Sequence, residues 1–279
     1  YSAAEPLFKR SLAIHEKIFG PEHPHFAKSL NALANLYYVK GHYNEAEQLY
    51  KRALGINEKA FGLEHPEVAT SLNSLAVLLD SVGNDSEAMR LYSRSLEIRE
   101  KALGPNHPDV AFSLNNMAVC LQDQGDYAQA VTLCKRALEI WENSLGSDHP
   151  RVGKTMTNLA TLLGQQGLYR AARSLHESAL VIQENALGPN HPDVARALNN
   201  LGEVHRAQGS FVGARPMYER ALEIWEKTLG PGHPYIAIPL NNLASLLYSF
   251  GLSEEARPLY ERALNIRENA LGPEHNDVA

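Results

Sequence analysis

Residues 103–118 read LGPNHPDVAFSLNNMA, and lightly varied copies of this stretch recur along the whole chain. The copies begin at Phe19, Phe61, Leu145, Leu187, Leu229 and Leu271, and when Leu103 is included each start lies 42 residues after the previous one. A fixed period of about 20 to 50 residues is typical of arrays in which each unit packs mainly on its neighbours. The sequence therefore predicts a solenoid, whose length is not limited by a single core.

Each unit predicts two helices. Pro24 suits the first position of a helix that runs to about Lys40, because the N–H that proline lacks has no partner there. The apolar residues of this helix fall at helical spacing, at Leu30, Leu33, Ala34 and Tyr37. A second helix is expected from about Tyr43 to Phe61, with Gly62 as its C′ residue.

The whole chain, residues 1–279, is expected to be one array of such helix pairs. Residues 1–23 match the second helix of a truncated repeat, and residues 276–279 match the start of a further one. Six full repeats lie between them, at 24–65, 66–107, 108–149, 150–191, 192–233 and 234–275.

When the repeats are aligned with one another, three positions, here called columns, carry the same residue in every repeat. We predict that these columns form core layers. They consist of alanine (Ala46, Ala88, Ala130, Ala172, Ala214 and Ala256), leucine (Leu54, Leu96, Leu138, Leu180, Leu222 and Leu264) and isoleucine (Ile56, Ile98, Ile140, Ile182, Ile224 and Ile266). Capping boxes are expected where Asn84 precedes Glu87 and where Asp126 precedes Gln129. Pro239 falls well inside an expected first helix, which it should bend.

Composition restricts the class of protein. A formal net charge of −6 argues against nucleic acid as the main partner. Two cysteines in 279 residues favour a reducing compartment, so a cytoplasmic location is expected. No apolar run is long enough for a transmembrane helix, and no membrane insertion is expected.

The pattern L30-x-x-L33-A34-x-x-Y37, followed by A46-x-x-x-Y50, resembles the tetratricopeptide repeat. The 42-residue unit, with L-G-P-x-H-P-x-V-A and L-N-N-L-A, is similar to the repeats of kinesin light chains and of nephrocystin-type proteins. The resemblance implies an all-α, right-handed superhelical solenoid of tetratricopeptide helix pairs. It also implies that the first helix of each pair lines a concave groove.

One histidine and one glutamate per repeat form two further columns, but neither predicts chemistry. The histidines (His23, His65, His107, His149, His191, His233 and His275) are about one repeat apart, too far to share a metal ion. We expect each His-Pro to close a loop and seat the next helix. The glutamates are expected to have a structural role, as acceptors for polar groups of loops or neighbouring helices. They are Glu16, Glu58, Glu100, Glu142, Glu184, Glu226 and Glu268. No catalytic residue, metal or cofactor is predicted.

Two other residue types are ambiguous. Cys120 replaces leucine in an apolar column and is expected to be a buried thiol. Trp141 and Trp225 lie late in second helices, where they could be partly exposed contacts or could cover the rim of their own repeat.

The candidate site lies on the first helices, on the face opposite the core stripe. Side-chain amides there offer a donor and an acceptor, and could bind the backbone of an extended peptide of any sequence. They could equally bond the preceding repeat and set its tilt. Basic residues cluster in the fourth and fifth repeats. The predicted peptide-binding residues are Asn115, Asn116, Lys154, Asn158, Arg196, Asn199, Asn200, Arg206, Asn241 and Asn242.

The expected function is that of a non-enzymatic scaffold or adaptor that binds an extended, acidic protein or peptide segment in its groove. The alternative is a structural or self-associating repeat arm of a larger signalling or sensor protein. End-to-end self-association is also expected, because terminal repeats without polar caps expose apolar surface.

Overall fold

The computed structural model describes residues 5–271, and within that range every regular element is a helix. In chain order these are α1 (Glu5–Phe19), α2 (Pro24–Val39), α3 (Tyr43–Phe61), α4 (Pro66–Ser81), α5 (Asp85–Leu103), α6 (Pro108–Asp123), α7 (Tyr127–Leu145), α8 (Pro150–Gln165), α9 (Tyr169–Leu187), α10 (Pro192–Ala207), α11 (Phe211–Leu229), the 3₁₀ turn η1 (Pro234–Ile236), α12 (Ala237–Ser249) and α13 (Ser253–Leu271). The expected stub at 276–279 and His275 lie outside the described residues.

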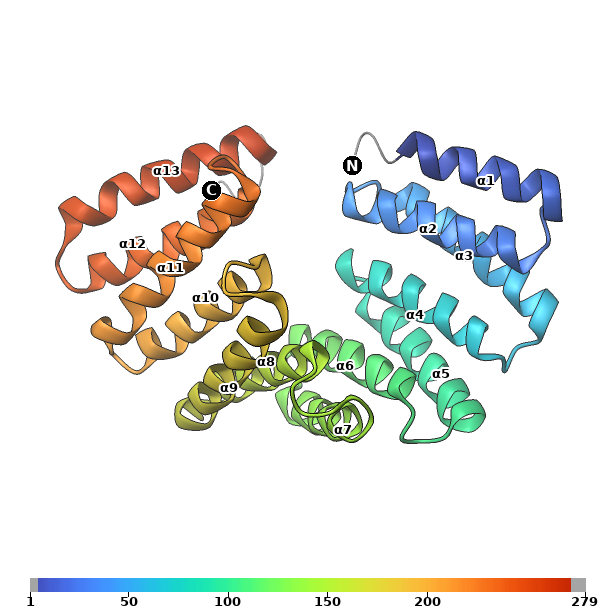
Figure 1. The fold of residues 1–279 in the computed structure, drawn as a ribbon, viewed down its shortest axis with the longest axis horizontal. Helices are drawn as coiled ribbons and strands as arrows, with labels where there is room; N and C mark the ends of the chain where they lie inside the picture. Colours follow the sequence, from blue (N-terminus) through green and yellow to red (C-terminus); the bar gives the residue numbers. More distant parts are fainter. Residues whose placement is uncertain (1–4, 272–279) are drawn as a thin grey trace. The chain divides into compact units, whose positions relative to one another are not determined.

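Two kinds of helix alternate along the chain (Figure 1). The contacts divide the chain into unit 1, which ends at Ile140 inside α7, and unit 2, which begins at Trp141. In unit 1, α2 packs on α3 and α4 on α5, while α3 contacts α4 and α5 contacts α6. In unit 2, α8 packs on α9, α10 on α11 and α12 on α13, and each pair contacts the next. The fold is an all-α solenoid, as predicted.

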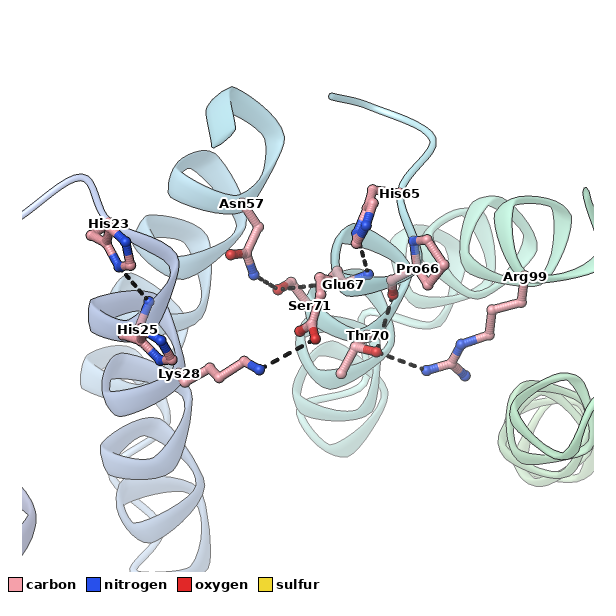
Figure 2. Close-up of polar contacts among 10 residues, drawn as sticks. All are labelled: His23, His25, Lys28, Asn57, His65, Pro66, Glu67, Thr70, Ser71 and Arg99. Carbon is pink, nitrogen blue, oxygen red and sulfur yellow. Dashed lines mark hydrogen bonds and ion pairs between the residues drawn. The ribbon is translucent and has the colours of Figure 1, made fainter. Parts of the chain in front are cut away.

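Each first helix begins with a histidine cap. The His65 Nδ1 accepts a hydrogen bond from the Glu67 backbone N–H at 3.2 Å, and His23 caps α2 through the His25 N–H in the same way (Figure 2). The same bond recurs at His107, His149, His191 and His233. Proline follows each cap at N1, where its missing N–H leaves no vacant donor. The structural interpretation of these His-Pro pairs is confirmed.

First helices end in a Schellman motif. In α2 the Gly41 N–H bonds the Tyr38 carbonyl, the His42 N–H bonds the Tyr37 carbonyl, and Gly41 has a φ of 77°. Second helices end differently from the expectation. Gly62 is the C-cap itself and not a C′ residue, with φ 82° and ψ 166°, a region open essentially to glycine alone.

The predicted core columns are confirmed for alanine and isoleucine, whose members are all buried. The leucine column is only partly buried, because these side chains lie at the edge of the contact with the following first helix; Leu264 of α13 is 43% exposed. Two tyrosine side chains also belong to the core. Tyr92 in unit 1 and Tyr218 in unit 2 are each almost fully buried beneath their own first helix.

Two local expectations are wrong. Asn84 makes no capping hydrogen bond, since Glu87 pairs with Arg90 instead; only Asp126 accepts from the Gln129 N–H, at 3.1 Å. Pro239 does not lie deep inside a helix. The segment from Pro234 to Ile236 is a 3₁₀ turn and α12 begins at Ala237, so Pro239 occupies the first turn, where its missing N–H costs little.

Replacing a histidine cap should destabilise the array locally. We expect His107→Ala to lower the free energy of unfolding by about 0.5–2 kcal/mol, because the first turn of α6 loses its side-chain acceptor. His107→Asn, which keeps an acceptor, should retain most of that stability. Denaturant unfolding followed by circular dichroism measures both changes; equal stability of the alanine and asparagine variants would show that the cap contributes nothing.

Candidate functional site

The glutamate column connects consecutive second helices. In unit 1, Glu58 pairs with Arg94 at 2.9 Å and Glu100 with Arg136 at 2.7 Å. Unit 2 has the same contact between Glu184 and Arg220 and between Glu226 and Arg262, each at 2.6 Å. The column is therefore structural, as expected. The pattern lacks an arginine opposite Glu142, where the equivalent residue is Ser178.

The metal-binding side chains of the described residues do not gather at one place. No three His, Cys, Asp or Glu side chains among residues 5–271 converge on a point where a metal could bind. Cys120 is buried as expected, and burial raises the pKa of both cysteine thiols, Cys120 and Cys134, to about 12. A thiol with such a pKa is protonated at pH 7 and is a poor nucleophile.

Both tryptophans are buried, so the suggestion that they are partly exposed contacts is wrong. Trp141 is 2% exposed and Trp225 is 4% exposed. Each packs at the junction with a first helix: Trp225 Nε1 donates to the Pro192 carbonyl at 3.0 Å, and Arg151 stacks on Trp141 with its guanidinium carbon 4.8 Å from the ring centroid. Tryptophan satisfies this position because its N–H finds a partner there.

In unit 1 the column that contains the two tryptophans carries polar residues that bond the next first helix. Asn57 Nδ2 donates to Ser71 Oγ at 2.9 Å (Figure 2). Arg99 donates to Ser113 Oγ at 2.7 Å and also reaches Thr70 across the junction. These buried side chains bond their neighbours and stabilise the junction, although the Arg99 Nε has no partner among the described residues.

The first-helix face of unit 1 is largely committed to such contacts. Lys28 of α2 pairs with Glu67 of α4 at 3.4 Å (Figure 2). Asn116 donates to Asn73 Oδ1 at 3.3 Å, which links α6 to α4. Asn115 is half-buried and also has an interaction partner. The packing interpretation of the asparagines therefore accounts for this part of the face.

Unit 1 also contains a cavity of about 280 Å³ between α4, α5 and α6. Asp80, Tyr92, Asn116 and Asp123 contribute to its wall. Burial, followed by the charges of neighbouring acids, raises the pKa of the Asp123 carboxyl and, despite a contact with Cys120, that of Asp80. This end of the first-helix face is acidic.

In unit 2, α8 and α10 each carry a cation near their N-terminal end, Lys154 and Arg196, and the two charges interact. Lys154 is exposed and has no ion pair among residues 5–271. Surrounding protein atoms, followed by the Arg196 charge, lower the pKa of the Lys154 ammonium, although Asp193 acts in the opposite direction. Arg196 itself pairs with Asp193 at 3.1 Å. Burial by these atoms is the largest cause of the lowered pKa, and the Arg196 charge, which outweighs that of Asp193, adds to it.

Arg206, the third predicted cation, is already paired. Glu203, one turn earlier in α10, binds its guanidinium at 2.8 Å, and this contact raises the pKa of Arg206. The Tyr218 hydroxyl donates to the same carboxylate. Asp193 offsets the charge of Arg196 as Glu203 offsets that of Arg206. The positive bias expected from the sequence is therefore reduced to the group of Lys154, Arg196 and Asp193, in which Lys154 is the cation without an ion pair among the described residues.

The predicted amides of unit 2 fall into two groups. Asn199 was expected to face the groove, but it is only 6% exposed and its Oδ1 accepts from Asn242 Nδ2 at 3.0 Å. This pair links α10 to α12 as Asn73 and Asn116 link α4 to α6. Asn158 has an interaction partner as well. Asn200 and Asn241 are half-buried and have no hydrogen-bond partner among the described residues.

A second cavity, of about 350 Å³, lies between α8, α9 and α10. Its wall includes Gly164, Tyr169, Asn200 and the Glu203–Arg206 pair, and His176 lies at its base. His176 is 1% exposed, and burial lowers its pKa to about 4, so the imidazole is neutral at pH 7. Sequence reasoning missed this cavity, although Gly164 and His176 are smaller than most of their counterparts in the other repeats.

The tetratricopeptide repeat model matches overlapping segments that together cover the chain, at residues 1–59, 25–101, 82–131, 109–183, 162–212, 193–269 and 236–279. No curated protein matches the sequence. None of the helices described between residues 5 and 271 has an apolar stretch long enough to cross a membrane.

Several solved structures share the fold. The chain is similar to BtubC (BKLC) from P. vanneervenii, with 25% identity and a TM-score of 0.67 over 82% of this chain and 91% of that one. It is also similar to a putative kinesin light chain with nearly identical repeats from Podosopora anserina, with 28% identity and a TM-score of 0.61 over 74% of this chain and 98% of that one. Apo RapI, at 16% identity and a TM-score of 0.71, shares the fold alone.

The interaction between the two cations can be measured directly. We expect Arg196→Gln to raise the pKa of Lys154, because a nearby positive charge is removed and Asp193 is released. NMR titration of the lysine side-chain resonances measures this pKa. Arg170→Gln, an exposed change on α9, serves as the control and should leave Lys154 unaffected. An unchanged pKa in Arg196→Gln would mean that the two charges are effectively screened from each other.

Proposed function

Because the chain belongs to the tetratricopeptide repeat family, whose fold is typical of non-catalytic protein-interaction scaffolds, we propose that unit 2 binds an extended, acidic segment of another protein. The proposal places this segment across the first turns of α8 and α10. The observation that supports it most strongly is the pair of neighbouring cations, Lys154 and Arg196, with Lys154 unpaired among the described residues.

A peptide carboxylate would relieve the repulsion between these two cations. Bonds from ionised donors to a carboxylate contribute about 1.5–3 kcal/mol, against about 1 kcal/mol for neutral ones. Charge also speeds encounter between partners. Acidic side chains of a partner are therefore the ligand that this part of the surface favours.

The peptide backbone requires neutral donors and acceptors, which Asn200 and Asn241 offer. Both are half-buried, so less side-chain entropy is lost when they bind than for a free surface residue. We assign backbone binding to these two residues and inter-repeat packing to Asn199 and Asn242. A reducing, cytoplasmic setting is part of the same proposal, since both cysteines are free thiols.

Charge reversal tests the proposal. Peptides selected on the wild-type chain from a random library should be enriched in Asp and Glu. Arg196→Glu should weaken their binding by about 10-fold to 100-fold and reduce its salt dependence, because a charge-assisted contact becomes repulsive. Titration at two salt concentrations, with circular dichroism to verify folding, measures both effects.

Lys135→Glu is the matched control, since it makes the same charge change on the exposed surface of α7. It should bind like the wild type. If no acidic peptide is enriched, or if Arg196→Glu binds like the wild type while folded, the structural or self-associating alternative takes precedence. Sedimentation at increasing concentration then tests the expected self-association.

A further inference from the structure

The cavity in unit 2 lies between three helices, at the place in the repeat where unit 1 has its smaller cavity of about 280 Å³. Gly164 stands where other repeats carry Tyr38, Asp80, Gln122, Arg206 and Tyr248. His176 stands where most carry tyrosine, and Tyr218 shows how such a ring uses the space, since its hydroxyl reaches Glu203 of its own first helix. With these two smaller side chains the cavity has about 350 Å³, against about 280 Å³ in unit 1 where Asp80 and Tyr92 stand, and this volume is within the range of ligand sites.

The base of this cavity carries an unsatisfied polar group. His176 Nδ1 is buried and has no hydrogen-bond partner among the described residues. A buried polar atom without a partner costs free energy, which a ligand that supplies the missing bond recovers. Asn200, on the wall, adds an amide whose donor and acceptor are both unused.

The cavity is also neutral, which distinguishes it from the cationic first turns of α8 and α10. Glu203 and Arg206 on its wall neutralise each other at 2.8 Å, and the His176 imidazole is uncharged at pH 7. A charged group that enters the cavity would lose its hydration without gaining an opposite charge. A ligand side chain that ends in a charge is therefore disfavoured. The chemistry favours a neutral group that both donates and accepts hydrogen bonds.

We propose that this cavity binds a carboxamide side chain, a glutamine of the partner segment, through hydrogen bonds to His176 and Asn200. A carboxamide has an oxygen with two lone pairs and a nitrogen with two N–H donors. It can therefore pair reciprocally with the Asn200 amide and still offer His176 Nδ1 its second N–H or its second lone pair, according to the tautomer of the imidazole. Val204 and Ala207 supply apolar wall for the methylene groups of the glutamine. This inference rests on the proposed function, to which it adds a second, neutral specificity position.

The geometry of α8 fixes the spacing of the two positions. Lys154 precedes Thr161 and Gly164, which line the cavity, by 7 and 10 residues, about 10–15 Å along the helix. An extended peptide advances about 3.3 Å per residue. The acidic residue and the glutamine of the partner should therefore lie roughly three to five residues apart.

A probe that does not depend on the acidic contact tests the cavity first. N-acetyl-glutamine methylamide is titrated into the chain with ¹³C-labelled histidine rings, and His176→Tyr, which restores the residue of other repeats, assigns the His176 signal. We expect a saturable shift of that signal with the glutamine probe, and none with the glutamate or methionine analogues. Gly164→Met should abolish the shift by filling the cavity. Its Cβ would meet Ala172 Cβ at an ordinary 3.9 Å, and methionine favours the helix.

Absence of a His176 shift with the glutamine probe would overturn the proposal, as would an equal shift with the glutamate analogue. A shift produced by the tyrosine analogue but not by glutamine would assign the cavity to a phenol ring instead. Each of these results stands whether or not acidic peptides bind.

A peptide series then separates this inference from the proposed function. Peptides carrying an Asp-Asp pair and, three to five residues later, either Gln or Glu should differ about threefold to tenfold in affinity, in favour of Gln. Arg196→Glu should weaken both peptides, whereas Gly164→Met should remove only their difference. Equal affinities with retained dependence on Arg196 would refute the cavity assignment and leave the acidic site intact.

Discussion

The array depends on one repeated contact, in which a first helix is buried between its own second helix and the second helix before it. The alanine column allows this approach, since Ala88 in unit 1 and Ala214 in unit 2 leave no space between the two helices of a pair. Burial of apolar area is the dominant favourable term in folding, and neither helix could bury its stripe alone. The caps, turns and junctions all serve to place each first helix in this position.

Polar chemistry adds specificity to that contact. Asn57 meets Ser71 and Arg99 meets Ser113, while Trp141 and Trp225 occupy the same column in unit 2. The junctions are therefore geometrically equivalent but chemically different. Replacing one partner would leave a buried donor unsatisfied, so each junction favours its own neighbour. The consequence is that residues of the first-helix face divide into those that hold repeats together and those left for a ligand.

This division explains the candidate surface. Asn199 and Asn242 satisfy each other, and Glu203 satisfies both Arg206 and Tyr218. Lys154 and Asn200 lack such partners among the described residues. Lys154 interacts with the charge of Arg196, and Asn200 lines the cavity at His176. The proposed ligand is accordingly mixed in character, with an acidic part facing Lys154 and a neutral part facing His176.

The sequence by itself determined the fold. A strict 42-residue period, proline at each first-helix start and invariant alanine and isoleucine columns depend only on local geometry and on the helical repeat, so helix order and core were predictable. The site was not predictable to the same degree, because side-chain pairing across repeats depends on distances that no local rule supplies. Arg206 and Asn199 looked available in the sequence, and only the tertiary structure showed that Glu203 and Asn242 engage them. The cavity at Gly164 and His176 likewise arises from three helices at once, which is why packing and not periodicity revealed it.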